Sequence, residues 1–109
     1  MLKKDKVTQD IMKAVVTEDL VTGDRVKTAN FGMNLKTTLA GMQPLLESGI
    51  LVSRPGLGIF VADGALEEIK RQMVREMGKK EIPRLVGRAK IIGLTSKDVA
   101  EMVKKEFNK

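Results

Sequence analysis

The chain has 109 residues, enough for one small domain with an appendage, and it contains no cysteine and no histidine. These absences exclude disulfides, thiolate nucleophiles, imidazole bases and the commonest zinc sites. The net charge of +6 favours a polyanionic partner such as nucleic acid. Because the sequence offers no grouping of a base, a nucleophile and an oxyanion site, we expect neither an enzyme nor a bound cofactor or metal.

The composition also bears on the core and on the compartment. Aromatic residues make up 3% of the chain and seven residues are methionine, so we expect a thin, aliphatic core. A thin core predicts that part of the apolar surface is buried between subunits. No run of about 18 apolar residues occurs and the first residues lack a signal peptide's apolar stretch, so we expect a cytoplasmic protein with no membrane partner.

The first predicted helix begins after Thr8, whose hydroxyl can cap it, and presents Ile11 and Val15 on one side. A glycine-containing turn at residues 22–24 ends it. Residues 27–30 then suit a single helical turn but not a long helix. The conformation of this short segment stays open.

A second helix and a hairpin follow. Asn34 is a good N-cap for a helix that continues to Ser48, although Pro44 lies inside it and is expected to kink it. Residues 50–54 and 58–62 are apolar and rich in β-branched side chains, and turn residues separate them. A helix followed directly by a hairpin is typical of a winged helix-turn-helix.

The remaining chain predicts helices. Residues 65–78 form an amphipathic pattern, and residues 81–92 form a second one that tolerates Pro83 in its first turn. Thr95 and Asp98 are spaced as a capping box that opens a last helix.

These elements predict a mainly α fold with a small β-hairpin. We expect a winged helix-turn-helix domain over residues 1–63 and a helical dimerisation tail of two to three helices over residues 64–109. Residues 1–63 carry eight Lys/Arg against seven Asp/Glu, or +1, whereas residues 64–109 carry twelve against seven, or +5. We interpret the basic residues of the tail as a solvated helix face rather than a binding patch.

Three segments resemble a known family. Gly32–Thr38 and Arg54–Val61 look like the recognition helix and the wing of GntR-type transcription regulators, and Val21–Val26 looks like the family's glycine-aspartate turn. Gly93–Ser96 resembles the start of the last helix in the short-tailed YtrA-like branch. The resemblance implies a bacterial homodimer that binds a palindromic operator, usually as a repressor, with the tail as dimer interface.

The resemblance and the helix pattern together indicate two sets of site residues. The candidate DNA-binding residues are Arg25, Lys27, Asn34, Lys36, Thr37, Thr38, Arg54, Gly56 and Gly58. The candidate dimer-interface residues are Leu66, Ile69, Met73, Met77, Leu85, Ile92, Val99 and Met102.

The sequence departs from the family pattern on the DNA-facing side. The space for the second helix is short, Leu39 and Ala40 replace basic residues of the recognition helix, and Pro55 and Leu57 replace basic residues of the wing. These departures favour an alternative function: a regulator-derived interaction protein that has lost sequence-specific DNA binding and pairs with itself or with a full-length homologue.

Overall fold

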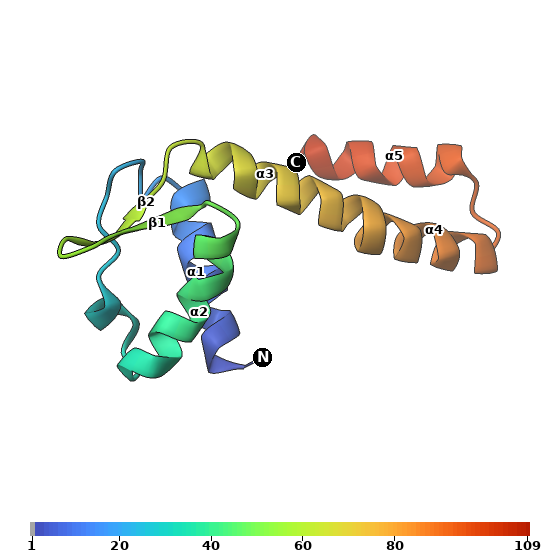
Figure 1. Cartoon of the computed structure of the whole chain (residues 1–109). Coiled ribbons are helices and arrows are strands. Elements are labelled where there is room, and N and C mark those ends of the chain that lie inside the picture. Colours follow the sequence, from blue (N-terminus) through green and yellow to red (C-terminus); the bar gives the residue numbers. More distant parts are fainter. Residues whose placement is uncertain (1) are drawn as a thin grey trace. The chain divides into compact units, whose positions relative to one another are not determined.

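The computed structural model describes residues 2–109 and is mainly helical with one two-stranded antiparallel hairpin, as the sequence predicts (Figure 1). The chain divides into two compact units, the first ending at Gln72 and the second running from Met73 to Lys109. The first unit therefore extends beyond residue 63, because Ala65 and Ile69 are buried in its core.

Helix α1 spans Lys3–Val16, so the prediction that it starts after Thr8 is wrong. Val7, Ile11 and Val15 repeat every four residues and are all buried, which extends the apolar stripe one turn ahead of Thr8. The Thr8 hydroxyl lies inside the helix and donates hydrogen bonds to the carbonyl oxygens of Lys4 and Gly41. It therefore ties α1 to the next helix instead of capping its own.

Helix α2 spans Leu35–Glu47 with Asn34 as its N-cap, as predicted, and it includes Pro44. Met42 and Leu45 are buried against the core. Gly41 is buried where the two helices meet, and a Cβ there would stand 2.6 Å from the Cβ of Val7. The absence of a side chain at Gly41 is what lets α1 and α2 approach each other.

The connection between α1 and α2 contains a single 3-10 turn, Thr28–Phe31, in place of a full helix. This agrees with the predicted single turn. Upstream of it, Arg25 forms an isolated antiparallel bridge with Phe60, and the Val26 N–H donates to the Ile59 carbonyl at 2.8 Å. The connection is therefore fastened to the edge of the hairpin.

The hairpin consists of β1, Leu51–Arg54, and β2, Gly58–Val61. Its register pairs Leu51 with Val61 and Arg54 with Gly58. Gly56 has φ +75 at the tip, a conformation that favours glycine, so it fixes the shape of the turn. The predicted hairpin and its turn are thus confirmed.

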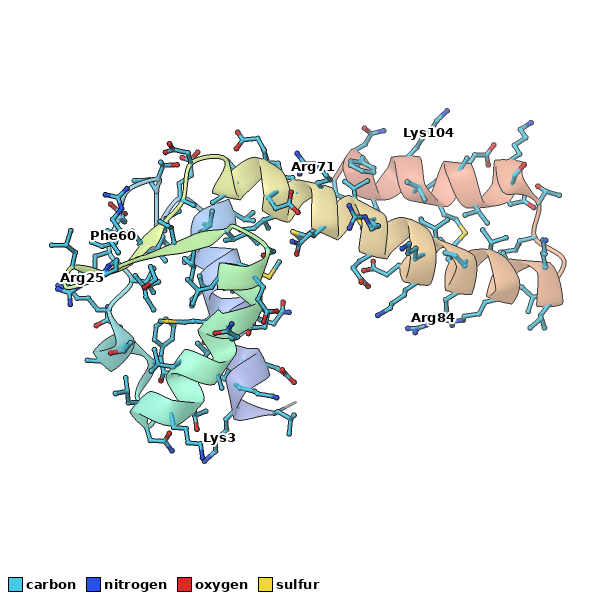
Figure 2. All side chains as sticks on the ribbon, viewed as in Figure 1. Lys3, Arg25, Phe60, Arg71, Arg84 and Lys104 are labelled. Atoms are coloured by element: carbon cyan, nitrogen blue, oxygen red, sulfur yellow. The ribbon has the colours of Figure 1, made fainter. Side chains whose placement is uncertain are left out.

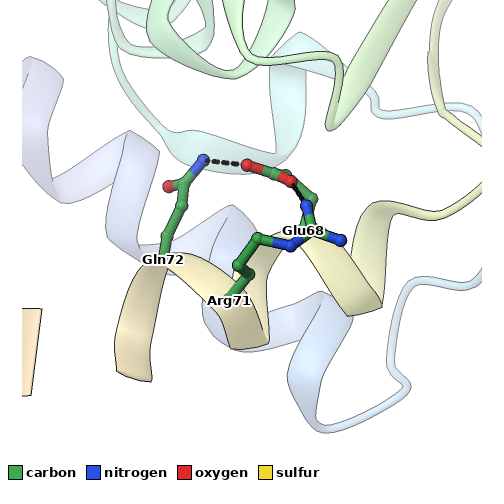
Figure 3. Close-up of polar contacts among 3 residues, drawn as sticks. All are labelled: Glu68, Arg71 and Gln72. Atoms are coloured by element: carbon green, nitrogen blue, oxygen red, sulfur yellow. Dashed lines mark hydrogen bonds and ion pairs between the residues drawn. The ribbon is translucent and has the colours of Figure 1, made fainter. Parts of the chain in front are cut away.

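Helix α3 spans Ala65–Glu76. Along this helix, the partly buried Glu68 pairs with the exposed Arg71 and accepts a hydrogen bond from the Gln72 amide at 3.2 Å (Figure 3). Pairs three and four residues apart stabilise a helix locally. Arg71 is therefore a partnered cation of a solvated helix face, in line with the interpretation of the tail's basic residues.

The sequence predicts two separate helices over residues 65–78 and 81–92, but the helical conformation continues from one to the other without a break. A π-helical segment, Met77–Glu81, leads directly into α4, Ile82–Ile91. Pro83 has no N–H to donate, and its ring would collide with the carbonyl four residues earlier in an α-helix. The wider π turn accommodates the proline without ending the helix.

The last helix, α5, spans Ser96–Phe107. Gly93, with φ +78, ends α4, and the Leu94 N–H returns to the Ala89 carbonyl at 2.9 Å. Thr95 and Asp98 form the predicted capping box. Among residues 73–109, all of which the structure describes, Ala89 alone is buried, so this unit has almost no core of its own.

Candidate nucleic-acid interface

The first turns of α2 are open to solvent. The Asn34 Oδ1 accepts a hydrogen bond from the Thr37 N–H at 2.8 Å, which fixes the start of the helix. Lys36 is exposed beside it, and Leu35 is 60% exposed. Backbone N–H groups at a helix start carry a partial positive charge and attract anions. This end of α2 therefore presents a polar cap and one ammonium group outward.

Thr38, a predicted DNA contact, is 0% exposed, so this prediction is wrong. Its hydroxyl donates to the Asn34 carbonyl oxygen at 3.1 Å, one turn back along the helix. The side chain faces the core and cannot contact DNA. Thr37, by contrast, is half-buried and keeps part of its surface.

Two predicted arginines gather on the hairpin. The Arg54 guanidinium lies 5.3 Å from the centre of the Phe60 ring, within the range of a cation–π contact. Arg25 reaches the same place through its bridge to Phe60, and its Nε would stand 2.8 Å from a Cβ at position 58 (Figure 2). A side chain at position 58 would collide with Arg25, so Gly58 leaves room for the Arg25 side chain beside the hairpin.

The other predicted contacts lie on exposed turns. Lys27 precedes the 3-10 turn, and Gly56 forms the tip of the hairpin. Leu57, next to that tip, is 62% exposed. The structure therefore brings Asn34, Lys36 and Thr37 together on α2 but places Gly56 on the separate wing.

Two lysines that the sequence reasoning does not single out lie beside α2. Lys3 and Lys4, in the first turn of α1, line one hollow with Lys36 and Thr37. The signal in the sequence is the repeat of Val7, Ile11 and Val15 every four residues, which indicates a helix that starts early enough to include both lysines.

The predicted dimer-interface residues fall into two groups. Ile69 is 0% exposed in the core of its own chain and Leu66 is packed against that core, so Ile69 has no surface to offer a second copy. The remaining residues lie in the second unit and keep part or most of their surface exposed: Met73, Met77, Leu85, Ile92, Val99 and Met102.

An apolar groove separates α4 from α5. On one side the groove is lined by Leu85 of α4 and by Ile92, the residue that follows α4. On the other side it is lined by Val99 and Met102 of α5. Arg88 and Glu106 stand at its margins. The groove therefore combines apolar walls with one charge of each sign.

The capping box of α5 has an electrostatic consequence. The Thr95 N–H donates to Asp98 Oδ2 at 2.8 Å, and the Asp98 N–H donates to the Thr95 hydroxyl oxygen at 3.2 Å. The hydrogen bonds from the Thr95 backbone and side chain hold the pKa of the Asp98 carboxyl below its ordinary value.

Residues 2–109 contain no group of three or more acidic, histidine or cysteine side chains that could hold a metal ion. In the same part of the chain, every helix is either too short or too polar to cross a bilayer.

No protein-family model matches the sequence, and no curated protein matches it either. Solved structures do match. A GntR-family transcriptional regulator from Bacteroides thetaiotaomicron superposes with a TM-score of 0.84 at 17% identity, covering 96% of each chain. A GntR-family regulator from Listeria monocytogenes gives 0.76 at 15% identity, covering 96% of this chain and 95% of its own.

A transcriptional regulator from Oenococcus oeni gives a TM-score of 0.79 at 14% identity, covering 95% of this chain and 89% of its own. These structures establish the fold along almost the whole chain. The protein has the winged helix-turn-helix fold, with its helical tail, that is seen in transcriptional regulators of the GntR family.

Proposed function

We propose that the protein is a transcription regulator that binds operator DNA as a homodimer and acts as a repressor. The observation that carries the proposal is the open first turn of α2, with Asn34 and Lys36, in the same unit as the wing. The wing carries Arg54, and Arg25 is bridged to it. The fold is similar to that of GntR-family regulators, which supports the assignment of these groups to a recognition helix and a wing.

The proposed contacts follow from the geometry of winged helices on DNA. The N-terminal turns of α2 enter the major groove, where Asn34, Lys36 and Thr37 meet base edges or phosphates. Arg25 and Arg54 contact the DNA backbone next to it, and Gly56 lets the tip of the wing approach closely. Lys27 adds a phosphate contact from the connection. With few cations on this surface, we expect moderate affinity and a modest salt dependence.

We assign dimerisation to the helical tail, residues 64–109, and within it to the second unit. Two helices that bury Ala89 alone among residues 73–109 have too little core for stability in water. A second copy laid on Met73, Met77 and the α4–α5 groove covers these apolar side chains in a self-complementary interface. We therefore assign the tail to the short, dimerising type that the resemblance to the YtrA-like branch implies.

A homodimer presents two equivalent recognition helices, which match the two half-sites of a palindromic operator. Occupation of an operator that overlaps a promoter keeps RNA polymerase away, which is the proposed mode of repression in the bacterial cytoplasm. The mechanism needs no catalytic group and no bound cofactor.

The test is a fluorescence anisotropy titration of the protein against the DNA upstream of its own coding sequence, with a scrambled duplex for comparison. We expect tighter binding to the upstream DNA than to the scrambled duplex. We also expect Lys36→Ala, whose exposed side chain is not needed for folding, to bind the upstream DNA more weakly. Equal binding to both duplexes by the wild-type protein contradicts the proposal.

One observation favours a second function. The helix that should support α2 is a single 3-10 turn, and Leu35 and Leu57 are 60% and 62% exposed on the presumed DNA side. A regulator-derived protein that pairs with a full-length homologue and binds no operator itself would have these features. Dimers in solution together with no operator binding at low salt favour this function over the first.

A further inference from the structure

A basic hollow lies where the first turn of α1 meets the first turns of α2. Lys3 and Lys4 line it from α1, Lys36 lines it from α2, and its remaining walls are Leu2, Thr37 and Ala40. Figure 2 shows the Lys3 side chain extending outward from the start of α1. Three lysines from two helices, distant in sequence, therefore line one concave surface.

The packing of α1 on α2 holds this hollow in place. Gly41 is buried against Lys4 and Val7, and the Thr8 hydroxyl donates to the Gly41 carbonyl oxygen. Both contacts lie within two turns of Lys3 and Lys36. The spacing of the lysines is thus set by a close helix crossing rather than by a loop.

The charges of the hollow are not neutralised by carboxylates. Among residues 2–109, no carboxylate oxygen lies within 4.0 Å of the side-chain nitrogen of Lys3, Lys4 or Lys36. The nearby Lys6 does form an ion pair, with Asp10 at 2.8 Å. Asp5 is exposed on α1 but does not line the hollow. An anion that enters the hollow therefore meets positive charge on both sides.

We propose that Lys3 and Lys4, together with Lys36, bind the phosphate backbone of duplex DNA irrespective of its sequence. The inference rests on the proposed function, because the hollow adjoins the turn of α2 that carries Asn34. Phosphates follow one another closely along a duplex, so several ammonium groups on one surface engage neighbouring ones. In a helix-turn-helix the first helix of the motif crosses the backbone, and here a 3-10 turn replaces it.

Lys3 and Lys4 therefore supply the phosphate-binding cations that the shortened connection between α1 and α2 does not provide. They fix the position of α2 on the duplex, whereas Asn34 and Thr37 remain the groups that face the bases. Loss of the phosphate contacts lowers affinity for every duplex, whereas loss of the base contacts removes the preference for the operator. The inference and the proposed function can therefore be tested separately.

The test uses the full-length protein, the upstream duplex and two unrelated duplexes, each titrated at several salt concentrations. The variant is Lys3→Gln with Lys4→Gln. Its control is Lys104→Gln with Lys105→Gln, an adjacent exposed pair on α5 that removes the same charge. Thermal melting of each variant checks that the fold is retained.

We expect the Lys3/Lys4 variant to bind every duplex more weakly. Because each protomer of the dimer loses two cations, the slope of log affinity against log salt should be smaller by about four. The Lys104/Lys105 control should keep the wild-type slope. An unchanged slope in the first variant, or an equal loss in the control, overturns the inference.

The outcomes also distinguish the inference from the proposed function. If the wild-type protein prefers its upstream DNA but the Lys3/Lys4 slope is unchanged, the inference alone fails. If all duplexes bind equally and the variant loses slope, the proposed operator function alone fails. Absence of any duplex binding at low salt, including a case in which the lysines bind anionic lipid vesicles instead, overturns both.

Discussion

At the scale of single residues, the crossing of α1 and α2 depends on one missing side chain. A Cβ at Gly41 would overlap the Lys4 carbonyl oxygen and stand 2.6 Å from the Val7 Cβ. A backbone oxygen cannot rotate aside as a side chain can, so the helices would have to separate. Overpacking of this kind costs about 1–3 kcal/mol.

Gly41→Ala should therefore lower the free energy of unfolding by about 1–3 kcal/mol, measured by urea denaturation. Gly87→Ala is the matched control, because a Cβ there meets nothing within 4 Å inside helix α4. The control should be neutral or stabilising by up to about 1 kcal/mol, as alanine favours helices over glycine. Equal effects of the two substitutions would disprove the close crossing.

Asp98 gives a prediction about pH. Its pKa is lowered in the folded chain by hydrogen bonds from Thr95, so its charged form stabilises the capping box. This contribution is fully present above the unfolded pKa, about 3.9, and is lost as pH falls through the lower folded pKa.

Asp98→Asn should therefore be less stable than the wild-type protein at neutral pH, and the difference should shrink as the solution is acidified below pH ~4. Thermal melting of both proteins from neutral to acidic pH measures it. A constant difference across that range would mean that the carboxylate does not contribute through its charge.

At the scale of elements, the π-helical segment Met77–Glu81 changes which side chains share a face. In a regular α-helix, Met77 and Leu85, eight residues apart, would point about 80° from each other at 3.6 residues per turn. The π segment accommodates one extra residue, which brings them to within about 20°. The apolar side chains before and after the segment thus form one stripe.

Pro83→Ala removes the obstacle to regular α-helical hydrogen bonding and should let the segment relax to an α-helix. Helix content by circular dichroism should be equal or higher, whereas self-association, measured by sedimentation equilibrium, should weaken because the stripe is broken. Lys79→Ala, an exposed change in the same segment, should alter neither. Unchanged association of Pro83→Ala would show that the π segment does not set the interface.

The sequence predicts an element best where the residues that determine it are close together in the chain. The Asn34 cap, the turn of the hairpin and the Thr95–Asp98 capping box are set by residues within four positions of one another. Each of them is found as predicted. For the segment near Thr28 the sequence excludes a long helix but leaves open the conformation, which the structure gives as a single 3-10 turn.

Other features depend on contacts that are distant in the chain. Thr8 resembles a cap but bonds to Gly41 across two helices, and Thr38 resembles a contact residue but faces the core. Ile69 fits an interface stripe, yet the core of the first unit buries it. Arg25 reaches the wing through a bridge to Phe60. Helical periodicity shows that a residue is apolar or polar, but not which partner covers it.

At the scale of the whole molecule, the proposed homodimer is held together by the second unit. Leu85 is 40% exposed and lines the groove between α4 and α5. A charge introduced there would be buried in the proposed interface at high cost. Gly87, two residues further along α4, lies about 200° around the helix axis from Leu85, on nearly the opposite side. A Cβ at this position would meet no atom within 4 Å.

Leu85→Lys should therefore sediment as a monomer, whereas Gly87→Lys, which adds the same charge, should remain dimeric. The monomeric variant should also bind operator DNA more weakly, because its two DNA-binding domains are no longer linked and cannot bind both half-sites as one unit. If Leu85→Lys remains dimeric with full affinity, the interface lies elsewhere on the chain.

The most direct test of the central claim is a hydroxyl-radical footprint of the wild-type protein on the DNA upstream of its own coding sequence. A homodimer that places α2 in the major groove should protect two symmetric patches, separated by about one helical turn of 10–10.5 base pairs or by a whole multiple of it. Protection that is uniform, confined to one patch, or absent at saturating protein would contradict the account of a dimeric operator-binding regulator.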